Sequence, residues 1–125
     1  MNLDLDLRGQ AVTRVCFDTA LTVLTSGDCE LRVETEAILQ VSARDHVSFD
    51  PETPEAAAPH LVGLVRDVIA EAEAGRAGDL VIKFESGTKL TVLPDEEYEA
   101  WGIVGPKGKR VTCMPGGEIA MWSGE

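Results

Sequence analysis

One stretch of this chain occurs twice in similar form: Leu21-Thr22-Val23-Leu24-Thr25-Ser26-Gly27, and again Leu80-Val81-Ile82-Lys83-Phe84-Glu85-Ser86-Gly87. Both copies are rich in apolar and β-branched residues and end in Ser-Gly, which favours a turn. A short strand-like segment precedes each copy (Val12–Val15 and Val65–Val68), and another follows it (Leu31–Val33 and Leu90–Val92). The echo therefore predicts two similar antiparallel β-meanders packed into one body.

Apolar residues alternate with polar ones in several further segments, which predicts additional strands with one face toward a core. These segments are residues 3–7, 38–41, 46–49, 98–104, 110–113 and 118–122. The intervening turns contain Gly and Pro, as in residues 105–108 and 115–117. The predicted fold class is α+β, with mostly antiparallel β-meanders in two related halves and one short helix.

The helix is expected at residues 54–63, because Thr53 suits an N-cap and Pro54 suits the first helical position. The following segment, residues 64–73, leaves two alternatives open. Its apolar spacing fits a helix, whereas the internal echo makes it a strand that turns back at residues 75–78. Because of the internal echo, we expect the helix to end near Gly63.

A length of 125 residues predicts a single domain, residues 1–125, with pseudo-repeat halves at about 7–50 and 61–122. The chain is 44% hydrophobic and 26% charged, which is typical of a globular protein. It contains no apolar run as long as a membrane span, and its N-terminus carries acids where a signal peptide would carry bases. These features predict a cytoplasmic protein.

The three cysteines agree with that location. Cys16, Cys29 and Cys113 are odd in number and show no Cys-x-x-Cys spacing. We expect buried free thiols in a reducing compartment. A contact between Cys16 and Cys29 would require neighbouring strands.

The formal net charge is −11, from 22 acids and 11 bases. Proteins that bind nucleic acids or anionic membranes present basic surfaces, so both kinds of partner are disfavoured. A basic protein partner is compatible with this charge, because opposite charges speed encounter. The simpler interpretation is that the acidity maintains solubility.

The sequence does not point to any catalytic, cofactor-binding or metal-binding residues. The only histidines, His46 and His60, lack the spacing of zinc ligands. A nucleophile elbow is absent, and residues 105–109 lack the glycine spacing and the Ser/Thr of a phosphate loop. We expect no cofactor.

The best candidates for an interaction surface lie late in the chain, where acids crowd one turn and three aromatic residues cluster. Such acids usually form a solvated face, and packing is the commoner role for Trp. By contrast, the positions of Phe17, Phe49 and Phe84 predict that they lie in the core. If the protein has a binding surface, it is expected near the bases of residues 107–110 and these acids. The candidate residues are Asp95, Glu96, Glu97, Tyr98, Glu99, Trp101, Lys107 and Trp122.

Three segments together resemble a family of small actinobacterial proteins grouped as a domain of unknown function. They are residues 7–15, Tyr98-Glu99-Ala100-Trp101, and the ending Cys113-Met114-Pro115-Gly116-Gly117-Glu118-Ile119-Ala120-Met121-Trp122. The resemblance implies a cytoplasmic single-domain protein and brings no catalytic residues. The size, acidity and layout are also loosely similar to immunity proteins that neutralise bacterial toxins.

These observations favour a non-enzymatic interaction module, for example an inhibitor of a basic protein. Neutralising Asp95, Glu96, Glu97 and Glu99 should then slow association and flatten its salt dependence. One alternative is a ligand-binding domain or enzyme with a pocket between the two meanders. Another is a structural homodimer that pairs strand edges.

Overall fold

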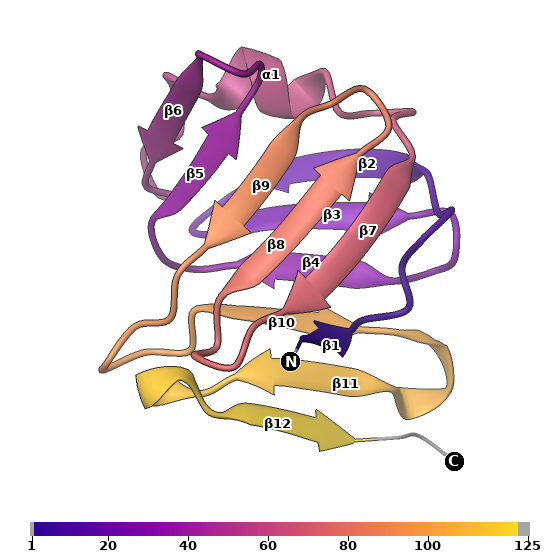
Figure 1. Cartoon of the computed structure of the whole chain (residues 1–125), viewed down its shortest axis with the longest axis vertical. Coiled ribbons are helices and arrows are strands. Elements are labelled where there is room, and N and C mark those ends of the chain that lie inside the picture. Colours follow the sequence, from indigo (N-terminus) through magenta and orange to yellow (C-terminus); the bar gives the residue numbers. More distant parts are fainter. Residues whose placement is uncertain (1, 123–125) are drawn as a thin grey trace.

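A computed structural model describes residues 2–122, and within them the strands form two six-stranded antiparallel sheets that pack face to face (Figure 1). The front sheet has the order β1 (Leu3–Asp4), β7 (Ile69–Ala74), β8 (Leu80–Phe84), β9 (Lys89–Val92), β5 (Ala37–Gln40) and β6 (His46–Phe49). The back sheet has the order β12 (Ile119–Trp122), β11 (Arg110–Cys113), β10 (Trp101–Val104), β4 (Glu30–Val33), β3 (Leu21–Thr25) and β2 (Val12–Phe17). The strands of the two sheets cross, and buried apolar side chains fill the space between them.

The two echoing meanders lie in different sheets. Strands β2, β3 and β4 form half of the back sheet, and β7, β8 and β9 form half of the front sheet. After each meander the chain crosses to the other sheet, so that β5 pairs with β9 and β10 pairs with β4. The registers correspond, since Ala37 lies opposite Val92 as Trp101 lies opposite Val33. Two crossover segments, one after each meander, therefore join the sheets, in addition to residues 5–11, which connect β1 to β2.

Regular helix is confined to five residues of the described chain, α1 (Ala58–Val62), and two 3-10 turns, η1 (Pro106–Gly108) and η2 (Pro115–Gly117). The prediction of mostly antiparallel β-structure with one short helix is confirmed, but the class is mostly β rather than α+β. The predicted cap was also wrong. The chain first makes a turn in which the Pro54 carbonyl accepts the amides of Ala57 and Ala58, so the helix starts later than predicted. Its N-cap is Ala57, whose methyl side chain cannot form a capping hydrogen bond.

Residues 64–73 are mainly turn and strand, as the echo predicted. The chain turns at residues 63–66, and β7 then begins at Ile69. A bulge between Ile69 and Glu71 inserts one extra residue into β7. The buried positions Ile69, Ala72 and Ala74 are consequently three and two residues apart. This bulge accounts for the helix-like spacing of three residues between Ile69 and Ala72.

Two of the three phenylalanines predicted in the core are there. Phe49 and Phe84 are each 4% exposed. Phe17 is 38% exposed, so its assignment to the core was wrong. It is the last residue of β2, at the edge of the back sheet. No helix of the described residues is long and apolar enough to cross a membrane.

A contact between two turns joins the sheets at one end. Gly78, in the β7–β8 turn, and Gly117, at the end of η2, both have φ near +97° (+96° and +97°). A Cβ on Gly78 would lie within 2.6 Å of the Gly117 Cα, and a Cβ on Gly117 would clash with the Ala77 carbonyl. The buried Trp101 indole N–H donates to the Gly78 carbonyl oxygen at 2.9 Å. We call this contact the glycine clasp; it explains why glycine is needed at position 117.

The cysteines are all unpaired; Cys29 and Cys113 are buried, and Cys16 is half-buried. Burial raises the pKa of the Cys113 thiol, a hydrogen bond with the Ala100 backbone lowers this pKa, and the Asp79 carboxylate raises it. The net shift is upward, so the folded state retains the proton at a pH where the unfolded chain ionises. This stabilisation is present below the unfolded pKa of about 8.5 and is lost as the pH rises through the folded value.

We therefore expect the free energy of unfolding to fall above about pH 8.5, by at most about 1.4 kcal/mol per pH unit from this thiol. Urea unfolding at a series of pH values measures the slope. Cys113→Ala should flatten it, whereas Cys16→Ala should leave it unchanged. Equal slopes for Cys113→Ala and the parent protein would contradict this assignment.

Candidate functional site

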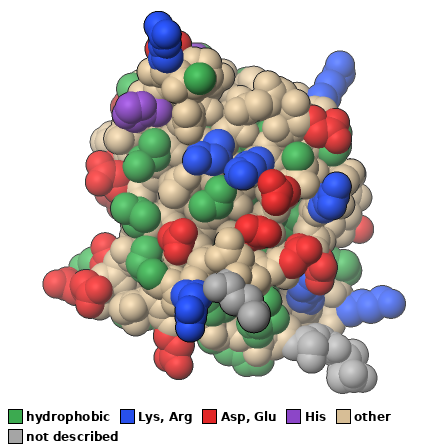
Figure 2. Space-filling view, in the orientation of Figure 1, with side chains coloured by type: hydrophobic (Ala, Val, Ile, Leu, Met, Phe, Trp, Pro, Cys, Tyr) green, Lys and Arg blue, Asp and Glu red, His purple; other side chains and the backbone are tan. Residues whose placement is uncertain are grey.

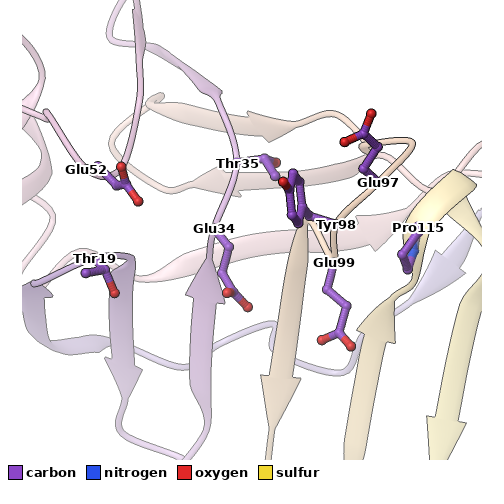
Figure 3. A pocket seen from close by; sticks show the side chains of 8 residues that line it. All are labelled: Thr19, Glu34, Thr35, Glu52, Glu97, Tyr98, Glu99 and Pro115. Atoms are coloured by element: carbon purple, nitrogen blue, oxygen red, sulfur yellow. The ribbon is translucent and has the colours of Figure 1, made fainter.

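The largest hollow described here lies where the two crossover segments pass each other, and it has a volume of about 720 Å³ (Figure 3). We call it the acidic hollow. Its lining consists of Thr19, Glu34, Thr35, Glu52, Glu97, Tyr98, Glu99 and Pro115. In Figure 3 Tyr98 stands near the middle of the group, with Glu97 on one side and Glu34 on the other.

Separate parts of the chain supply the lining. Glu34 and Thr35 follow β4, and residues 97–99 precede β10. These two segments are held together because the Glu34 amide donates to the Ala100 carbonyl oxygen at 2.9 Å. Glu52 follows β6 and therefore arrives from the front sheet. The hollow is thus a product of both crossovers.

Asp95 fixes the turn that carries the late acids. Its Oδ1 accepts hydrogen bonds from the amides of Glu97 at 2.8 Å and Tyr98 at 3.1 Å. Its backbone carbonyl accepts the Gly116 amide at 2.8 Å. Asp95 therefore positions Glu97 and Tyr98 and anchors them to η2.

The charge of the hollow is one-sided. Four of its lining residues are glutamates, and none of the described residues that line it is basic. The one nearby ion pair joins Arg32 Nε to Glu34 Oε2 at 3.8 Å, with both side chains more than 40% exposed. Such an exposed pair contributes little, so it leaves the negative potential of the hollow largely in place.

Two further polar groups of the lining differ in their exposure. The Thr35 hydroxyl oxygen is buried and has no hydrogen-bond partner within the described chain. Tyr98 is 65% exposed and offers a ring face and a phenol. Together with the carboxylates, Tyr98 allows the hollow to bind a cationic group by charge, hydrogen bonds and cation–π contact.

The predicted surface residues are divided by the structure. Glu97, Tyr98 and Glu99 line the acidic hollow, and Glu96 is exposed beside them. Asp95 acts through backbone hydrogen bonds. Trp101 is wholly buried, at 0% exposure, so its side chain is not available to a partner.

Lys107 and Trp122 lie in a separate hollow of about 350 Å³. Lys107 belongs to η1, which follows β10, whereas residues 97–99 of the acidic hollow precede β10. Trp122 is 52% exposed, and the Arg110 guanidinium lies 5.7 Å from its ring centroid. The length of β10 thus separates these two residues from Glu97 and Glu99.

Sequence reasoning missed Thr19, Glu34, Thr35 and Glu52. Each lies close to the end of a predicted strand, but none belongs to a motif. Only the pairing of β4 with β10 brings Glu34 to Glu99.

As for metals, His46 and His60 are exposed, and within residues 2–122 no three His, Cys, Asp or Glu side chains are grouped to hold an ion.

Comparison with known protein families finds a match for this chain. The family of unknown function DUF6188 matches residues 3–123, which is nearly the whole chain. The chain belongs to DUF6188. This membership agrees with the resemblance to a domain of unknown function, and the actinobacterial origin stays an expectation. No curated protein and no solved structure matched this DUF6188 chain.

Proposed function

We propose that this DUF6188 protein is a binding module that takes up a cationic segment of a partner protein in the acidic hollow. The observation that carries the proposal is the convergence of four glutamates, from three separate segments, on one hollow without a basic residue in its described lining. Four carboxylates around one hollow give it a negative potential that an opposite charge would compensate. A partner's Lys or Arg side chains would supply that compensation.

The surroundings favour a protein segment over a single metal ion. The hollow is open to solvent and about 720 Å³ in volume, large enough for several side chains. Tyr98 is exposed beside the carboxylates and can stack on a guanidinium or ammonium group. The net charge of −11 would also speed the encounter with a basic protein.

A different variant from the one suggested by the sequence is needed to test this proposal. Neutralising Asp95 would loosen the turn that holds Glu97 and Tyr98, so it would mix a structural effect with an electrostatic one. The informative variant instead changes Glu34, Glu52, Glu97 and Glu99 to Gln. Its matched control changes four exposed acids outside the hollow to Gln, namely Glu30, Glu55, Glu85 and Glu118.

We expect the hollow variant to associate with oligolysine and oligoarginine peptides at least about tenfold more slowly at low salt, with a flatter salt dependence. The control carries the same net charge and should lose much less. Stopped-flow measurements at several salt concentrations give both quantities. Equal losses in the two variants would show that only net charge matters and would refute the hollow as the binding site.

The natural partner can then be sought by native mass spectrometry of the protein purified gently at low salt. The proposal requires a stoichiometric basic protein that dissociates at high salt and fails to bind the hollow variant. Retention of the same partner by the hollow variant would contradict it.

We also propose the cytoplasm as the location of this protein. The support is that all three cysteines are free thiols, including Cys16, which is half-buried. Free thiols persist in reducing compartments.

A further inference from the structure

A row of polar side chains crosses the outer face of the front sheet. The strand registers place Glu71 opposite Lys83, Lys83 opposite Lys89, Lys89 opposite Gln40, and Gln40 opposite His46. Figure 2 shows adjacent positively charged side chains near the middle of this face. We call these five residues the lysine row.

The two lysines are a costly pair within the sheet. Like charges directly opposite each other on neighbouring strands destabilise the sheet. Lys83 has a partner, since its Nζ lies 3.6 Å from Glu71 Oε2. Lys89 is half-buried, and within residues 2–122 no carboxylate oxygen lies within 4.0 Å of its Nζ. The charge of Lys89 is therefore uncompensated by the described chain.

The fold itself does not require lysines at these positions. In the back sheet, β3 and β4 correspond to β8 and β9 by their place in the meander. In the back sheet, Leu24 lies opposite Glu30 in the last register pair before the Ser26-Gly27 turn. In the front sheet, Lys83 lies opposite Lys89 in the last register pair before the Ser86-Gly87 turn. Because an apolar residue and an acid occupy the equivalent place, the meander itself does not require a pair of lysines there.

The lysine row borders a hollow of about 480 Å³. Its lining consists of Gln40, Ser42, Ala43, Ala70, Glu71, Lys83, Phe84, Gly87 and Lys89. The amide of Gln40 and the hydroxyl of Ser42 can donate hydrogen bonds beside the two ammonium groups. Ala43, Ala70 and Gly87 provide a small apolar surface next to them, whereas the Phe84 side chain is buried in the core. The only acid in this lining, Glu71, is already engaged by Lys83.

We propose that this hollow binds a small organic phosphate monoester. Its dianionic phosphoryl group would lie between Lys83 and Lys89, where it compensates both charges and accepts hydrogen bonds from Gln40 and Ser42. The organic part would contact the apolar surface formed by Ala43 and Ala70. The site lies on the face of the front sheet and shares no lining residue with the acidic hollow, so it stands apart from the proposed function.

The test is a titration of the full-length protein, followed by the backbone amide NMR signals and by the thermal midpoint. The probes are phenyl phosphate, inorganic phosphate and benzoate, each at constant ionic strength set with sodium chloride. We expect saturable shifts at Gln40, Lys83 and Lys89, with phenyl phosphate tighter than inorganic phosphate and benzoate weaker than phenyl phosphate. The thermal midpoint should rise with phenyl phosphate.

The deciding variant is Lys89→Met, which keeps the length of the side chain and removes its charge. Its matched control is Lys107→Met, which removes the same charge from η1. Lys89→Met should weaken phenyl phosphate at least about tenfold, as expected for loss of one charge-assisted contact. Lys107→Met should bind as the parent protein does.

Three outcomes would overturn the proposal. The first is an absence of saturable shifts with either phosphate. The second is equal weakening by Lys107→Met and Lys89→Met, which would indicate general electrostatic attraction. The third is benzoate binding as tightly as phenyl phosphate, which would remove the requirement for a dianion. Because Lys89 is a surface position, a folded Lys89→Met protein is expected, and its unliganded thermal midpoint verifies this.

Discussion

Replacing Trp101 by alanine is expected to destabilise the protein by about 3–5 kcal/mol, because its side chain is completely buried and the vacated space cannot collapse fully. The same substitution removes the indole N–H that donates to Gly78 in the glycine clasp. A loss of this size is comparable to the whole stability of many small domains. Urea unfolding, monitored by circular dichroism, measures it.

Two companion variants separate the causes. Trp101→Phe retains most of the buried ring but leaves the Gly78 carbonyl without the indole donor, so we expect a smaller loss of about 1–3 kcal/mol. Trp122→Ala is the control, because Trp122 is 52% exposed and its removal should cost less than about 1 kcal/mol. A Trp101→Ala protein as stable as Trp122→Ala would show that Trp101 is not in the core.

The second large effect is expected for Gly117→Ala. Adding a single methyl group here would force Cβ into the Ala77 carbonyl, and the φ of +97° is unfavourable for any residue except glycine. Both turns of the glycine clasp would have to separate, which would also disturb the hydrogen bond from Trp101 to Gly78. We expect a destabilisation above about 4 kcal/mol, or a failure to fold at all.

Gly116→Ala is a closely matched control for this prediction. Gly116 is the preceding residue, its φ is +87°, and a Cβ there would meet nothing within 4 Å. Its substitution should therefore cost only the conformational penalty of about 1–2 kcal/mol. Thermal and urea unfolding of both variants provide the comparison. If the two substitutions cost the same amount, the steric account of the glycine clasp is wrong.

The candidate site was only partly predictable. The acids of residues 95–99 stood out because they are consecutive, and three of the predicted residues there line the acidic hollow. Glu34 gave no signal, since its proximity to Glu99 depends on a strand pairing that spans more than sixty residues. Glu52 gave none either, because it reaches the hollow from the other sheet, after β6. The grouping of Trp101 with Trp122 failed because Trp101 faces the core from β10, whereas Trp122 lies opposite the exposed Arg110 at the end of the edge strand β12.

The sequence by itself determined the β character of this protein, its turns and its internal echo. The alternation of apolar and polar residues involves only a few neighbouring positions, and so do the turns that contain Gly, Pro or Ser-Gly. Both signals can therefore be recognised without knowledge of the fold. The tertiary structure alone decided which strand pairs with which across the crossovers, and thereby the acidic hollow, the glycine clasp and the lysine row. Those features depend on how two apolar sheet faces pack, and packing is a property of residues distant in sequence.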